Sequence, residues 1–107
     1  MIRFVLSTFP DEETASRIVR ELVEAHHAAC GTIIPKAKSI YRWQGNIEEA
    51  SEAVVIFKIP TENFVAFQKA LLGIHPYETP EIAAFEAKEV SEAYAKWVLE
   101  CCPESRL

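Results

Sequence analysis

Hydrophobic positions along this chain follow two periods, and the change from one period to the other separates strands from helices. A compact apolar run from Ile2 to Thr8 predicts a buried strand. Asp11 then predicts a helix N-cap, with acidic residues in the first turn, where the helix dipole favours them. The helix is expected to run to about Ala29, and its apolar stripe consists of Ala15, Ile18, Val19, Leu22 and Val23.

The stretch from Gly31 to Ile59 predicts two long strands joined by a tight turn at Gln44-Gly45-Asn46. Glycine adopts a positive φ at no steric cost, and asparagine tolerates the same region. Pro35 lacks an N–H donor, so it indicates a bulge or an edge position in the first strand. Because ordinary strands have roughly 3–10 residues, one small sheet cannot cover this hairpin, and its tip is expected to project.

A projecting hairpin that carries Tyr41 and Trp43 would expose aromatic surface and unpaired strand edges in a monomer. We therefore expect a homo-oligomer in which each hairpin pairs with a neighbour. The two rings are also able to stack on a ligand. Aromatic residues are common at subunit interfaces, however, so the interface is the favoured interpretation.

The second half of the chain predicts a helix, a strand and a final helix. Thr61 is expected to cap the first helix, which ends before Pro76 because the residue preceding a proline is pushed out of helical geometry. Glu81 to Lys88 is expected to form the last strand, and Ser91 to cap a helix that Pro103 ends. The predicted inward residues are Phe64, Phe67, Leu71 and Ile74 in the first helix and Tyr94, Trp97, Val98 and Cys101 in the second.

The predicted order is βαββαβ followed by a terminal helix. This order is typical of an α+β, ferredoxin-like fold with helices on one face of an antiparallel sheet. A length of 107 residues predicts a single domain over residues 1–107.

Composition narrows the class of protein. Half of the residues are hydrophobic and the net charge is −5, which argues against a nucleic-acid-binding protein. The three cysteines form no C-x-x-C pair, and a disulfide between adjacent Cys101 and Cys102 would be strained, so free thiols and a cytoplasmic location are expected. The apolar run at the start is too short for a signal peptide or a membrane span.

No hydrolytic triad or glycine-rich phosphate loop can be identified, so an enzyme is not expected. Strong metal motifs are also absent, but Ser7, His75, Glu78 and Glu81 are able to assemble a metal site in space. A structural role for His75 in its rigid turn is at least as well supported. Cys30 would be the soft ligand, although a small buried hydrophobe is the favoured interpretation.

The acidic run from Glu48 to Glu52 lies near the predicted hairpin tip. It could collect cations loosely. A solvated edge that prevents unwanted strand pairing is the favoured explanation.

Several motifs together resemble the CutA family, which is named for divalent-cation tolerance. The resemblance runs from the first strand to Trp97 and rests on motifs in a fixed order, which are Ala28-Ala29-Cys30, Ile34-Pro35, Ser39-Ile40-Tyr41-Arg42-Trp43-Gln44-Gly45, His75-Pro76-Tyr77-Glu78-Thr79-Pro80-Glu81 and Tyr94-x-x-Trp97. It implies a ferredoxin-like fold and a homotrimer in which the hairpins pair between subunits. It also implies an association with heavy-metal tolerance, copper binding and, in animal relatives, membrane anchoring of a partner enzyme.

The chain departs from the family pattern at four positions. Some members carry cysteine in place of Ser7 and a second histidine in place of Ile74, so nitrogen and sulfur ligands are lost here. Glu86 stands where a proline is usual, and Val90 where a glycine is usual.

The resemblance predicts a non-enzymatic, cytoplasmic, homotrimeric CutA-like protein that binds divalent cations weakly. No cofactor is expected to be required, and Cu(II) or another divalent cation is the expected ion. His75, Glu78, Glu81 and then Cys30 are the predicted metal ligands, and Tyr41, Trp43 and Gly45 the predicted trimer-interface residues. The alternative is a trimeric scaffold or small-molecule sensor similar to PII signalling proteins, with an anion or metabolite in a cleft lined by Lys36, Lys38 or Arg42.

Overall fold

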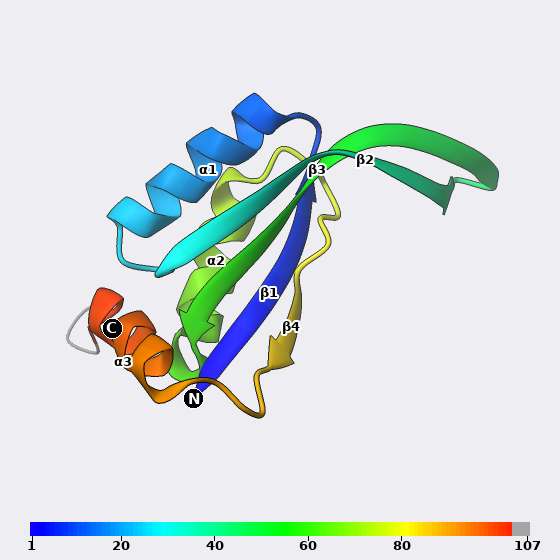
Figure 1. The fold of residues 1–107 in the computed structure, drawn as a ribbon. Coiled ribbons are helices and arrows are strands. Elements are labelled where there is room, and N and C mark those ends of the chain that lie inside the picture. The colour runs from blue at the N-terminus through cyan, green and yellow to red at the C-terminus, as the bar shows by residue number, and fades with distance from the viewer. Residues whose placement is uncertain (104–107) are drawn as a thin grey trace.

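The fold was analysed in a computed structural model, which describes residues 1–103. Four strands form one antiparallel sheet in the order β2-β3-β1-β4 (Figure 1). This arrangement confirms the predicted α+β, ferredoxin-like order with its additional terminal helix. The elements are β1 (Ile2–Phe9), α1 (Glu12–Glu24), β2 (Cys30–Trp43), β3 (Asn46–Pro60), a 3₁₀ turn (Thr61–Asn63), α2 (Phe64–Ile74), β4 (Ala83–Glu86) and α3 (Glu92–Cys101).

The two faces of the sheet pack on different helices because side chains alternate along each strand. On β1, Val5 and Phe9 face α1 and α2 and belong to the main core. Ile2 and Phe4 point the other way and pack with α3 in a second cluster. The main core also contains Ala15, Ile18, Leu22, Val55, Phe57, Ile59, Phe67 and Leu71.

Helix α1 begins as predicted, since the backbone N–H of Thr14 donates a 2.7 Å hydrogen bond to Asp11 Oδ1. The helix ends at Glu24, however, and the predicted extension to Ala29 is wrong. His26 has φ 63°, a left-handed conformation that a continuing helix does not allow. The chain turns there and leads into β2.

The later elements are shorter than predicted, and one of the two predicted caps is wrong. Strand β4 contains four residues, whereas Glu81 to Lys88 was predicted. Ser91 is the N-cap residue of α3, as predicted, although its side chain makes no capping hydrogen bond. Thr61 instead begins the 3₁₀ turn, and the N-cap of α2 is Asn63. On α3, Ala95 and Val98 are buried while Trp97 is 43% exposed, so the predicted inward stripe is displaced toward Ala95.

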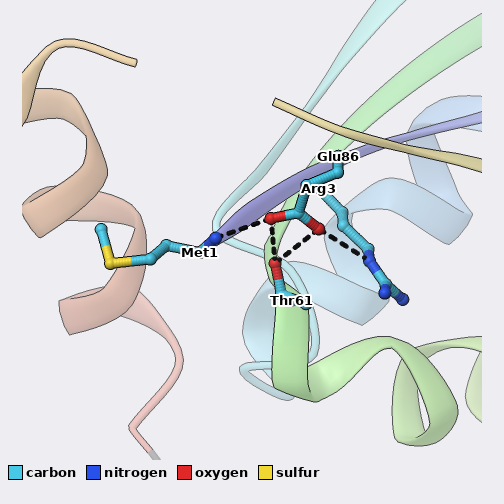
Figure 2. Close-up of polar contacts among 4 residues, drawn as sticks. All are labelled: Met1, Arg3, Thr61 and Glu86. Carbon is cyan, nitrogen blue, oxygen red and sulfur yellow. Dashed lines mark hydrogen bonds and ion pairs between the residues drawn. The ribbon is translucent and has the colours of Figure 1, made fainter. Parts of the chain in front are cut away.

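Glu86 joins the ends of three segments (Figure 2). Its carboxylate accepts hydrogen bonds from the Met1 ammonium at 2.6 Å, from Arg3 Nε at 3.1 Å and from the Thr61 hydroxyl. These contacts, with the ammonium as the largest cause, lower the pKa of Glu86 to about 2. Glu86 therefore connects β4 to β1 and to the turn before α2.

The β2–β3 hairpin extends well beyond the rest of the sheet, as predicted (Figure 1). Strand β1 pairs with β3 only as far as Ala53, and residues 37–52 form a two-stranded arm without a third strand. At the tip, Gln44 and Gly45 both have positive φ, 49° and 84°, as a two-residue hairpin turn of type I′ requires. Asn46 was predicted in the turn but is the first residue of β3.

A bulge at the base of the arm changes which side chains face which way. Ile34 pairs with Val54 and Ala37 pairs with Glu52, so β2 contains one more residue than β3 between these pairs. Lys36 has φ 61° within this bulge, which confirms the irregularity predicted from Pro35. Because one extra residue exchanges the two faces, the odd-numbered residues of the arm on β2 lie on the sheet face opposite α1 and α2.

Candidate functional site

A groove of about 670 Å³ lies between the arm and the segment that connects α2 to β4. We call it the arm groove. The odd-numbered arm residues line one side, as the bulge dictates, and the proline-containing connector lines the other. Its lining residues are Thr8, Ser39, Tyr41, Trp43, Glu52, Pro76, Tyr77, Glu78, Thr79 and Glu81.

The lining of the arm groove is acidic. Glu52 comes from the arm, and Glu78 and Glu81 come from the connector. None of the described residues that line it is lysine or arginine. Three carboxylates without a lining cation create a negative potential, which attracts cations.

A hydrogen bond joins the two sides of the arm groove. The hydroxyl of Tyr77 donates to Glu52 Oε2 at 2.6 Å, a length typical of an O–H donor bound to a carboxylate. Burial, followed by this bond to Glu52, raises the pKa of Tyr77 well above its ordinary value. Tyr77 therefore stays protonated and holds the connector to the arm.

His75 lies behind the connector and supports it. Its ring stacks on Phe9 with 4.5 Å between ring centroids, and its Nε2 lies 3.2 Å from the Ser7 hydroxyl. The backbone N–H of Tyr77 donates to Nδ1 at 3.1 Å, so Nδ1 acts as an acceptor. Nε2 then carries the proton of the neutral ring and donates it to Ser7.

Burial is the main cause that lowers the pKa of His75. The Thr8 backbone and the Glu52 carboxylate raise this pKa, but the effect of burial is larger. His75 is therefore a neutral ring at pH 7 whose two nitrogens both have partners within the chain.

The structure separates the predicted metal ligands. Glu78 and Glu81 line the arm groove, and His75 lies beneath it with both nitrogens engaged. Cys30 begins β2 at the other end of the sheet, where its Sγ lies 3.8 Å from the Tyr94 hydroxyl. Within residues 1–103, no three His, Cys, Asp or Glu side chains are grouped closely enough to hold a metal ion.

The predicted interface residues divide between two places. Tyr41 and Trp43 line the arm groove and are 44% and 45% exposed. Gly45 occupies the hairpin turn at the tip. Lys38 lies on the opposite face of the arm, 3.6 Å from Glu49, so the predicted anion site at Lys36, Lys38 or Arg42 does not coincide with this groove.

Sequence reasoning missed Glu52 and Tyr77 as a contacting pair. Glu52 was interpreted as one member of a solvated acidic edge, and Tyr77 only as part of a motif. The available signal was the alternation along β3, because Ala53 and Val55 face the core and Glu52 therefore faces the other side of the sheet.

The sheet face opposite α1 and α2 is only partly covered within residues 1–103. Helix α3 packs at one end of it, and the arm groove occupies the other. Ile34 and Phe85 on this face are 46% and 56% exposed. Ile40 and Ile47, on the arm face turned away from the groove, are 63% and 61% exposed.

The sequence predicted no membrane span in the apolar run at the start of the chain. In the part of the chain that the structure describes, every helix is too short or too polar to cross a membrane.

Comparisons with known proteins agree with one another. Residues 3–101 match the family model described as "CutA1 divalent ion tolerance protein". A divalent-cation tolerance protein CutA from Thermus thermophilus is 40% identical over 94% of this chain and 97% of its own length. Mouse Protein CutA is 37% identical over 85% of this chain, which spans about half (51%) of that longer relative.

Solved structures show the same likeness. The structure of the divalent cation tolerance protein Cut A1 from Thermus thermophilus aligns with a TM-score of 0.92 at 39% identity, covering 96% of this chain and all of that one. CutA1 from Oryza sativa aligns with a TM-score of 0.93 at 26% identity, covering 96% and 94% of the two chains.

Proposed function

Because this chain belongs to the CutA1 divalent ion tolerance protein family, we propose that it contributes to divalent-cation tolerance by binding divalent cations weakly. The proposed role is that of a non-enzymatic binding protein, and Cu(II) is the cation we would test first. The cytoplasm is the proposed compartment, a location that suits the three free cysteine thiols.

The observation that carries the proposal is the acidic lining of the arm groove. Glu78 and Glu81 are exposed carboxylates on a connector stiffened by Pro76 and Pro80, and Glu52 faces them from the arm. Carboxylates are hard ligands that bind cations directly or through their hydration water.

The same geometry explains why the binding is proposed to be weak. The described residues present no preformed group of three ligands, so a cation would keep most of its water. His75 would have to give up its contact with either Tyr77 or Ser7 before it could ligate an ion. Some family members carry cysteine where this chain has Ser7, so a hydroxyl and not a thiol lies beside that ring here.

Calorimetric titration with Cu(II) tests this site. The double variant Glu81→Ala with His75→Ala should bind more weakly than the parent chain, and unchanged affinity would reject the site. Glu78→Gln with Glu81→Gln should weaken binding similarly, because both groove carboxylates are neutralised. The matched control is Glu89→Gln with Glu100→Gln, which removes the same charge from exposed positions outside the groove.

We also propose that the chain forms a homotrimer whose arms pair between subunits, with Tyr41, Trp43 and Gly45 at the seam. The support is physical: an arm with no third strand, and a partly covered sheet face that carries Ile34 and Phe85. Native mass spectrometry should detect three chains. A light-scattering mass equal to one chain would reject the trimer.

A further inference from the structure

The arm groove is larger than the site of a small metal ion, and its lining includes aromatic rings that such an ion does not use. Its volume of about 670 Å³ falls within the range of roughly 300–1,000 Å³ usual for small-molecule pockets. One side presents the half-exposed rings of Tyr41 and Trp43, which offer no ligand to a hydrated metal ion. Aromatic faces attract organic cations, because the ring quadrupole is negative above its plane.

We propose that the arm groove binds a linear organic polycation of the aliphatic polyamine class. The ammonium groups would contact Glu52, Glu78 and Glu81, and the methylene chain would lie against Tyr41 and Trp43. This inference goes beyond divalent-cation binding and does not depend on it.

The charges of the site match such a ligand. A polyamine carries several positive charges separated by apolar methylene segments, and the groove lining combines three carboxylates with Pro76 and the rings of Tyr41, Trp43 and Tyr77. One oxygen of Glu52 accepts the Tyr77 hydroxyl, and the other is available for an ammonium group. No lysine or arginine among the described lining residues competes for these carboxylates.

The chemistry disfavours other occupants. An anion would meet three carboxylates without a lining cation, which costs electrostatic energy. A neutral apolar ligand would leave those carboxylates desolvated and unpaired, which is more costly still. Tyr41 and Trp43 also stand at the seam of the proposed trimer, so the ligand would contact the parts of these rings that the neighbouring subunit leaves open, and its binding should strengthen the assembly.

The test uses spermidine as the probe and Trp43 fluorescence as the readout. Trp97 lies on α3, away from the groove lining, so Trp97→Phe leaves Trp43 as the single tryptophan. Spermidine is titrated in buffer that contains a metal chelator, at a fixed moderate ionic strength. Saturable quenching or a saturable spectral shift is expected, and a response that only rises linearly to high concentration would overturn the proposal.

Two sets of variants then separate the polyamine from a metal ion. Glu52→Gln with Glu81→Gln keeps the side-chain shapes and should weaken spermidine at least tenfold, whereas Glu49→Gln with Glu89→Gln should change it little. Trp43→Leu, measured by calorimetry, should weaken spermidine by about 2- to 30-fold through loss of the cation–π contact. Titration of the same variant with Cu(II) measures metal binding separately.

These outcomes distinguish the two proposals. The polyamine site would be overturned if the Glu52/Glu81 and Glu49/Glu89 double variants lost spermidine affinity equally, or if Trp43→Leu did not change that affinity. The Cu(II) titration would still decide metal binding. Spermidine that binds only after Ile34→Glu, on the partly covered sheet face, has dissociated the assembly would show that a second copy closes the groove. That result would also overturn the proposal.

Discussion

The hydroxyl of Tyr77 donates a 2.6 Å hydrogen bond to Glu52, and this contact joins the connector before β4 to the arm. The two residues are 25 positions apart in the chain. Glu52 and Tyr77 both line the arm groove, so their contact joins its two sides. It also keeps an acidic side chain and a proton donor together at a half-buried position.

Removing that hydroxyl should loosen the groove. Tyr77→Phe is expected to reduce the free energy of unfolding by about 1 kcal/mol, since a hydrogen bond to a carboxylate is lost at a half-buried position. Urea denaturation followed by circular dichroism measures the change. Tyr41→Phe is the control, because the Tyr41 hydroxyl makes no hydrogen bond within residues 1–103. An equal loss of stability in Tyr41→Phe would contradict a stabilising role for the Tyr77–Glu52 hydrogen bond.

Acidification should destabilise the chain through His75. Burial lowers the pKa of His75 in the folded state below its ordinary value of 6.5, so the unfolded chain binds the proton first as the pH falls. The contribution of His75 to the free energy of unfolding is therefore fully present above about pH 6.5, and it is lost as the pH falls through the folded-state pKa. Urea midpoints at pH 7.5 and pH 5.0 should differ less in His75→Gln than in the parent chain.

The matched control is His27→Gln, which makes the same substitution but leaves the His75 ring in place. His27 precedes β2 and lies outside the stack that Phe9, His75 and Tyr77 form. If stability depended on pH equally in the parent chain and in His75→Gln, burial would not govern the pKa of the His75 ring.

Glu86 should titrate far below an ordinary glutamate. The Met1 ammonium, Thr61 and Arg3 lower its pKa from 4.5 to about 2. Its contribution to stability is present above pH 4.5 and lost as the pH falls through about 2, because the unfolded chain takes up the proton first. Carbon-13 NMR of the Glu86 carboxyl should show a midpoint near 2, and a midpoint near 4.5 would contradict the contacts in Figure 2.

Close packing under β2 makes one glycine intolerant of substitution. A Cβ at Gly31 would lie 2.9 Å from Val19 Cγ1 and 3.2 Å from Phe57 Cδ1. Gly31→Ala should therefore cost about 1–3 kcal/mol of folding free energy through overpacking. Gly73→Ala is the control, since a Cβ at that α2 position meets no atom within 4 Å and should be neutral or stabilising.

Local patterns in the sequence were sufficient for most of the fold. The apolar periods located all four strands and three α-helices, and Asp11 marked the start of α1. Boundaries failed where a tertiary contact replaced a local one. The side chain of Thr61 contacts Glu86 in place of its own helix, and His26 turns the chain before Ala29.

The candidate site was less predictable. The motif from His75 to Glu81 indicated the connector correctly, yet it did not show that both ring nitrogens of His75 have partners. Cys30 had the right chemistry for a soft metal, but its distance from the connector depends on the order of the strands. Such separations are set by pairing between distant segments, which local periodicity does not encode.

By itself, the sequence determined the elements, the long hairpin and the tight turn at Gly45, because period, proline and glycine act over a few neighbouring residues. Only the tertiary structure decided that Tyr41, Trp43 and Glu52 face the connector. One extra residue in the bulge exchanges the faces of β2, and the packing of His75 on Phe9 places the connector opposite them. The acidic, aromatic groove is the product of those two long-range relationships.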